Sequence, residues 1–215
     1  MKLQDRAAML AVTLLTLALL ALATHGAFAQ AEPGHDVRDI TVGMPVDDIP
    51  NAGYVNLTCA GDANHKLTAW SAWRECPADA DALRGVRFDF DPQTSRDGTL
   101  VGGHPVLLTV LIDDTGTVAA LTIETDPKAR LYMHKKAFLL GVQVKSRYGS
   151  DGWACTQGQP ELGELPVGGV YLRESCRKAV PGRVLVVERD LFRRPDQDVK
   201  NFVDQTQVKI TREPK

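Results

Sequence analysis

The chain has 215 residues, 44% of them hydrophobic, and a formal net charge of −2. This apolar content is ordinary for a globular protein with a core of normal size. A slightly acidic chain does not attract phosphate backbones or anionic lipid by long-range electrostatics, so we expect no nucleic-acid partner.

The first 29 residues have the pattern of a secretory signal peptide. A short basic start is followed by residues 7–23, which are uncharged and rich in Ala and Leu, and Ala27-Phe28-Ala29 places small residues before a cleavage point. We predict a mature chain that begins at Gln30, has no membrane span and works in the periplasm or outside the cell. In the alternative, the apolar run is retained as an uncleaved membrane anchor.

All four cysteines follow this segment, and an even number of cysteines in an exported chain predicts disulfide bonds. Within the pairs the spacing is 17 and 21 residues, whereas 79 residues separate the second cysteine from the third. We therefore predict two local bridges, Cys59–Cys76 and Cys155–Cys176. We expect neither a metal nor a cofactor, because no Cys-x-x-Cys occurs and no histidine lies at ligand spacing from a cysteine.

The first half of the mature chain predicts mainly strands. Residues 39–44 predict a short strand or an extended lead-in, and Pro45 with the acidic residues after it predicts a helical turn. Val86–Phe90 alternates apolar and polar side chains, which predicts a half-buried strand. Val106–Ile112 and Thr117–Glu124 are β-branched runs joined by a glycine-containing turn, and they predict a hairpin.

The second half begins with a helical period. Apolar side chains recur at helical spacing over Lys128–Tyr148, and Gly149 should end this helix. Strands are predicted at residues 183–189, which contain four consecutive apolar residues, and at residues 199–210, where Val208 and Ile210 alternate with charge.

Together these elements predict an α+β fold, in which helices pack on an antiparallel sheet. Each half has the same order: a helical segment, a cysteine, a polar loop, a second cysteine and antiparallel strands. This order predicts two similar modules in tandem, at residues 30–127 and 128–215. The alternative is one continuous domain.

Residues 40–45, Ile-Thr-Val-Gly-Met-Pro, precede a short acidic segment that ends near Gly53. This entry resembles that of small bacterial envelope modules in the β-lactamase inhibitor protein and outer-membrane assembly lipoprotein superfamily. The resemblance implies an α+β fold and a protein-binding role, and it supplies no catalytic residue. Pro50 departs from the pattern, because it interrupts the helix where the family usually continues.

Two classes of function follow. The first is a non-catalytic protein-binding or envelope-associated module, whose partner would be another envelope protein. The second is a small secreted, hydrolase-like enzyme with a site near His104, assembled with Asp89 and Glu124. An enzyme needs a pocket with convergent polar groups. No Gly-x-Ser-x-Gly turn accompanies His104, so the binding module is the favoured hypothesis.

The predicted binding surface consists of Trp70, Trp73, Arg183 and Arg189, because Trp and Arg dominate interface energetics. In the strand 183–189 the two arginines share one face with alternate apolar residues. Two alternatives remain open. The tryptophans would pack against disulfides in the core, and the arginines would flank the core at the ends of the sheet.

Overall fold

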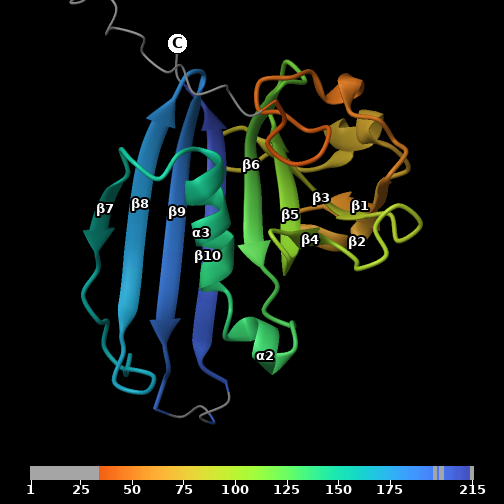
Figure 1. The fold of residues 1–215 in the computed structure, drawn as a ribbon. Helices are drawn as coiled ribbons and strands as arrows, with labels where there is room; N and C mark the ends of the chain where they lie inside the picture. The colour runs from red at the N-terminus through yellow and green to blue at the C-terminus, as the bar shows by residue number, and fades with distance from the viewer. Residues whose placement is uncertain (1–33, 196–197, 199–200, 214–215) are drawn as a thin grey trace, which may run out of the picture. The chain divides into compact units, whose positions relative to one another are not determined.

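Antiparallel strands form a single sheet that runs through most of the chain (Figure 1). The computed structural model describes residues 34–195, 198 and 201–213, so the predicted signal peptide at residues 1–29 lies outside the described residues. Across the sheet the order is β2-β1-β3-β5-β6-β10-β9-β8-β7, and the short β4 pairs with β5. In chain order the strands are β1 (Tyr54–Cys59), β2 (Asp62–Lys66), β3 (Arg84–Phe90), β4 (Leu100–Val101), β5 (His104–Ile112), β6 (Val118–Thr125), β7 (Ala154–Gln157), β8 (Leu172–Val180), β9 (Arg183–Phe192) and β10 (Val203–Arg212).

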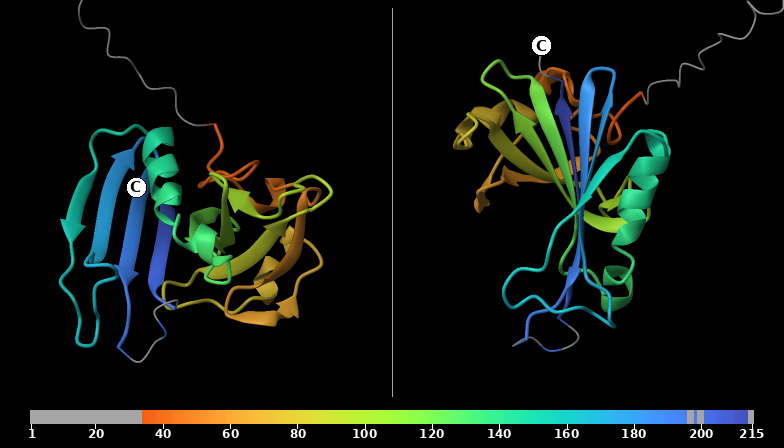
Figure 2. Two further views of the ribbon diagram at one scale, coloured as in Figure 1. Left: turned by 60° about the horizontal axis from the view of Figure 1, so that its bottom comes forward. Right: turned by 90° about the vertical axis from the view of Figure 1, so that its left-hand side faces the viewer.

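Helices are few and short in the described residues. Two are 3-10 helices, η1 (Val46–Asp48) and η2 (Trp70–Glu75), and two are α-helices, α2 (Leu131–His134) and α3 (Phe138–Arg147). Helix α3 lies against β9 and β10, and Figure 2 shows α2 and α3 on the same side of these strands. Within the described residues, no helix combines the length and the apolar character that crossing a membrane requires.

The predicted α+β class is wrong, because strands make up 45% of the chain and helices only 13%. The predicted helix over Lys128–Tyr148 divides into α2 and α3, since the chain turns between them at residues 135–137. After Pro45 only the three-residue η1 forms, and Pro50 follows it closely. By contrast, β8, β9 and β10 each extend over nine or ten residues. The fold is therefore a β-rich antiparallel sheet with one substantial helix.

The predicted hairpin is confirmed. Strands β5 and β6 pair in antiparallel register, with Leu108 opposite Ile123. The turn between them contains Gly116 at a φ of +81°, a conformation that glycine adopts without a steric penalty. The other alternating segments are also strands: residues 86–90 lie in β3, residues 183–189 lie in β9, and β10 covers the described end of the last predicted strand.

The two predicted modules share this sheet. Strand β6, from residues 30–127, is hydrogen-bonded to β10, from residues 128–215, and Ile123 lies opposite Val208. All described residues belong to one compact unit, Glu32–Lys215. A repeat of two similar modules within that unit stays a prediction.

Alternation along the strands gives the sheet a covered face and an open face. On the covered face, apolar side chains such as Leu108, Ile123 and Val187 are buried against α3, η2 and the N-terminal segment. The residues between them point to the open face, where Thr122 is half-buried and Lys209 is exposed. Antiparallel sheets commonly bury one face and leave the other to solvent. The open face is therefore the side on which strand residues can meet a partner.

A buried ion pair fastens the N-terminal segment to the covered face. The carboxylate of Asp36 lies 2.9 Å from Nε of Arg183 in β9, accepts a hydrogen bond from the hydroxyl of Tyr148 at 2.5 Å, and accepts another from the backbone N–H of Val42 at 2.7 Å. The Asp36 side chain is completely buried. Burial and the contact with Asp36 raise the pKa of the Tyr148 phenol well above its usual value of 10, so the phenol stays protonated and donates.

Replacement of this carboxylate should be costly. We expect Asp36→Ala to lower the free energy of unfolding by about 3–5 kcal/mol, because it leaves the Arg183 guanidinium buried without its partner. Urea unfolding followed by tryptophan fluorescence measures the change. Asp47→Ala removes an exposed carboxylate of the same segment and should change stability by less than about 0.5 kcal/mol. A loss for Asp36→Ala as small as that of the control would contradict the role given to the buried pair.

Candidate functional site

The two predicted surface tryptophans lie in the core. Trp70 and Trp73 are each 1% exposed. The ring of Trp70 meets those of Tyr54 and Phe88 edge-on, at centroid distances of 5.6 and 5.2 Å. Cys76 ends the short helix η2 that carries both tryptophans. The structure thus shows the alternative in which the tryptophans pack in the core beside a disulfide.

The two predicted surface arginines point to the covered face. Arg183 pairs with Asp36 and is 7% exposed. Arg189 pairs with Asp204 of β10 at 3.0 Å, and its guanidinium lies 5.4 Å from the centroid of the Phe138 ring on α3. A partner could reach Arg183 only if the covering segments moved away, whereas the Arg189 side chain is 20% exposed. Binding through them stays a prediction, and the accessible strand residues lie on the other face.

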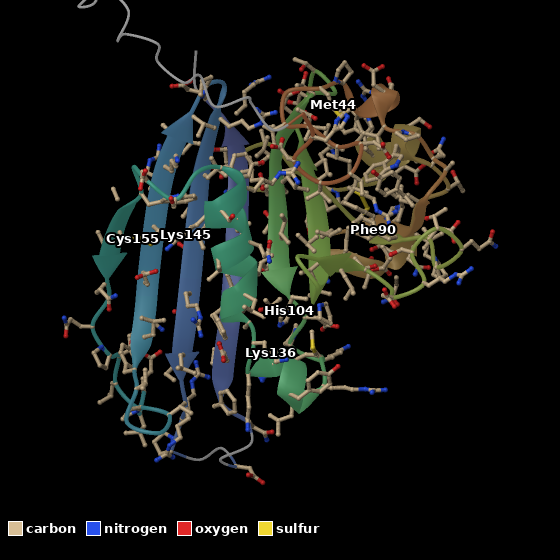
Figure 3. The ribbon with its side chains drawn as sticks, in the orientation of Figure 1. Met44, Phe90, His104, Lys136, Lys145 and Cys155 are labelled. Carbon is tan, nitrogen blue, oxygen red and sulfur yellow. A yellow bond between two sulfur atoms is a disulfide. The ribbon has the colours of Figure 1, made fainter. Side chains whose placement is uncertain are left out.

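The three residues of the predicted enzyme site do not converge. His104 is 1% exposed, and its ring nitrogens lie 2.9 Å from the backbone carbonyl oxygens of Pro105 and Met133 (Figure 3). Asp89 and Glu124 lie on the open face, where Asp89 accepts a hydrogen bond from Asn56 and Glu124 accepts one from Gln207. Since His104 faces the opposite side of the sheet, the geometry assembles no acid–base group from these three residues.

Both predicted disulfides are confirmed. Cys59 is bonded to Cys76, and Cys155 is bonded to Cys176. Disulfides of this kind are typical of proteins that work in oxidising compartments. Among the described residues, the one group of side chains close enough together to hold a metal is Cys155, Glu174 and Cys176. Because both sulfurs are in the disulfide, only the carboxylate of Glu174 could act as a ligand there.

The Cys155–Cys176 bridge joins directly opposite residues of β7 and β8 and fixes the last strand of the sheet. All four residues of β7 are exposed, and no strand in the described chain pairs with its outer edge. Lys145 of α3 contacts the bridge from the covered side, with its Nζ 3.1 Å from Sγ of Cys176 (Figure 3). The edge strand is thus short, exposed and held in place covalently.

A hollow of about 360 Å³ lies beside this edge strand. Three of the residues that line it are small, so their side chains leave the space unfilled: Thr156, Ser175 and Gly158. Glu188 and Asp190 of β9 form its acidic inner wall. Glu188 is exposed and makes no ion pair with another described residue. Partial burial raises the pKa of Asp190 above its usual value, although the nearby charge of Arg173 lowers it in part.

Arg173 organises the loop at residues 158–170 beside the hollow. Its guanidinium pairs with Glu161, with Glu164 at 2.6 Å and with Asp190 at 3.5 Å. Desolvation alone would raise the pKa of Glu164, but hydrogen bonds from the Glu161 amide and the Tyr171 hydroxyl, with the charge of Arg173, bring it below its usual value. Because three carboxylates share Arg173 and Glu188 has no ion-pair partner among the described residues, the neighbourhood of the hollow is acidic.

The sequence patterns did not indicate this site. We expected the Cys155–Cys176 bridge to close a polar loop, whereas the bridge links two paired strands. A disulfide between two neighbouring strands places its cysteines opposite each other, which here pairs residues 154–157 with residues 174–177. This pairing of the segments around the two cysteines is the feature of the sequence that could have predicted β7.

No protein-family model, no curated protein and no solved structure matches this chain. The function is therefore inferred from the geometry of the site.

Acid should loosen the loop at residues 158–170. The folded-state pKa of Glu164 lies below its usual value of 4.5, so the stabilisation is present above pH 4.5 and is lost as the pH falls further. We expect amide-exchange protection at Leu165, corrected for intrinsic rates, to fall below pH 4.5 before that of β9. In Glu164→Gln the protection should be lower at neutral pH and should change less with acid. The same acid dependence in wild type and variant would assign the effect to other groups.

Proposed function

We propose that the protein is a non-catalytic periplasmic or secreted module that binds an extended segment of another envelope protein. The partner segment would pair with β7 and add an eleventh strand to the sheet. The observation that supports this proposal is the unpaired outer edge of β7 beside an acidic hollow. In strand addition of this kind, main-chain hydrogen bonds provide affinity and side-chain pockets provide specificity.

The backbone of β7 has the required groups on its outer side. The N–H of Gly158 donates to the carbonyl of Arg173 at 2.7 Å, so the backbone groups of Gly158 point inward, toward β8. In an antiparallel ladder such residues alternate with residues whose N–H and C=O point away from the neighbouring strand. Cys155 and Gln157 therefore direct their backbone groups outward, where they can pair with a partner strand.

The hollow favours a basic side chain on the partner. Glu188 has no charged partner among the described residues, and Asp190 shares Arg173 with Glu161 and Glu164. A lysine or arginine from the added strand would extend over the small side chains of Thr156 and Ser175 toward the carboxylate of Glu188, which lies three strand spacings away. The resemblance of residues 40–45 to envelope modules implies a protein-binding role of the same kind.

A peptide-display experiment tests the proposal. Random peptides selected on the purified protein should share one lysine or arginine within an extended, β-prone segment. We expect Gln157→Pro to weaken binding of these peptides about tenfold, because it removes an outward N–H that contributes about 1 kcal/mol and places a proline ring on the edge. Gln157→Ala is the matched control, since it removes the same side chain and keeps the N–H. Fluorescence anisotropy with labelled peptides measures the affinities.

Charge preference is tested separately with Glu188→Gln. This variant should weaken the binding of basic peptides by about tenfold, since a charged hydrogen bond contributes about 1.5–3 kcal/mol. It should leave the affinity of the same peptides with Lys replaced by Gln unchanged. If Gln157→Pro binds as tightly as Gln157→Ala, pairing at β7 is contradicted. If Gln157→Pro weakens binding but Glu188→Gln affects the Lys-containing and the Gln-containing peptides equally, pairing at β7 is supported. The role of the hollow in recognising a basic side chain is then contradicted.

A further inference from the structure

Helices α2 and α3 lie in the most basic stretch of the chain. Residues 127–150 contain Lys128, Arg130, Lys135, Lys136, Lys145 and Arg147 and no Asp or Glu. The segment therefore carries +6, and the remaining residues carry −8, because the whole chain carries −2. The small net charge of the protein thus conceals a strong separation of charge, which composition alone did not reveal.

The same helices expose large apolar side chains. The described part of the chain exposes six large hydrophobic residues, and four of them belong to α2 and α3: Leu131, Tyr132, Phe138 and Val142. Tyr132 is 58% exposed and Val142 is 53% exposed. Contiguous exposed apolar residues of this kind usually mark an interaction surface.

The helical period explains why Val142 points outward. Leu140 and Val144 are buried against the sheet, whereas Val142 lies two positions before Val144, about 200° away around the helix. Phe138 lies at the start of α3, where its ring contacts the guanidinium of Arg189 and stays 39% exposed. Helix α3 therefore exposes apolar area at its start and on the side directed away from the sheet. Figure 2 shows that α2 continues along the same side of β10.

Four cations flank α2 without an ion-pair partner among the described residues. Lys128, Arg130, Lys135 and Lys136 are exposed, and none of them makes an ion pair with another described residue. The ammonium of Lys136 lies 5.8 Å from the ring centroid of Tyr132, so a cation and an aromatic ring sit together. Lys145 and Arg147 are engaged, with Glu174 and with the carbonyl of His35. We call the four free cations and the four exposed apolar residues the basic–aromatic patch.

We propose that the basic–aromatic patch binds the surface of an anionic phospholipid bilayer. The apolar side chains of α2 and α3 enter the interfacial region, and the four cations contact headgroup phosphates. An amphipathic helical surface with aromatic residues and flanking Lys and Arg is the type of structure that lies in a membrane interface. The protein is then attached to the membrane peripherally, through a surface that shares no residue with β7 or its hollow.

The charge of the patch favours an anionic bilayer over a second copy of the chain as its partner. A symmetric contact between two patches would bring the four free cations of each copy together, which is unfavourable. An anionic bilayer instead offers a continuous negative surface to the patch and repels the rest of the chain, which carries −8. The charge separation thus both attracts the protein to the bilayer and orients it.

Vesicle sedimentation tests this proposal with the secreted protein. Vesicles of phosphatidylcholine with about one third phosphatidylglycerol should bind it at 0.1 M salt, and vesicles of phosphatidylcholine alone should not. Lys135→Gln/Lys136→Gln should weaken binding about 20-fold to 30-fold, since each basic residue near an anionic surface contributes about a fivefold factor. Lys66→Gln/Lys209→Gln removes two exposed lysines elsewhere and should bind as wild type. Tyr132→Ser/Val142→Ser should also weaken binding while the protein keeps its thermal unfolding midpoint, because both side chains are more than half exposed.

Three results would overturn the proposal: equal binding to neutral vesicles, an equal loss in the Lys66/Lys209 control, or no binding to anionic vesicles. The third result would direct attention to an acidic protein partner for the patch. Since peptide binding at β7 uses other residues, failure of the vesicle test leaves the strand-addition proposal standing, and the reverse also holds.

Discussion

Contact between α3 and strands β9 and β10 determines which side of the sheet is available to a partner. Leu140 and Val144 are buried in this contact. Gly141 permits the close approach, because a Cβ at this position would lie 3.3 Å from Cγ1 of Val187. One helix is sufficient on this half of the sheet because alternation places the apolar side chains of both strands on the same face. The opposite face, with its alternating polar residues, can then remain in water without a second layer.

Sequence signals that act over a short distance predicted their elements correctly. The Asp113–Gly116 turn has β-branched runs on both sides, so the hairpin follows from local chemistry alone. The two disulfides follow from the spacing of the cysteines, since each bridge closes within a single half of the chain. Alternation also located β3 and β9 and placed Arg183 and Arg189 on one face of β9.

Features that depend on distant residues were not predictable in this way. Alternation in β9 cannot show whether its arginines face solvent or core, because the partner of Arg183 is Asp36, 147 positions earlier. The helical period of Lys128–Tyr148 is real, but it does not show the turn at residues 135–137 that leaves two short helices. The α+β prediction failed for a related reason. The charged residues of β8 come in adjacent pairs, so its sequence lacks an alternating pattern and its place in the sheet depends on pairing with β9.

The separation of the two proposed surfaces has a physical origin in the same layered arrangement. Helix α3 covers β9 and β10 and leaves β7 uncovered, so the edge strand stays accessible while the outer side of α3 faces away from the sheet. Lys145 is the group of α3 that reaches toward β7, and it contacts Glu174 and Cys176 rather than the outer side of the helix. Its charge is therefore used to hold α3 to the disulfide-linked edge, and the cations left for a membrane surface lie in the segments on either side of α2. A bilayer bound at the patch would thus leave the backbone of Cys155 and Gln157 free to pair with another chain.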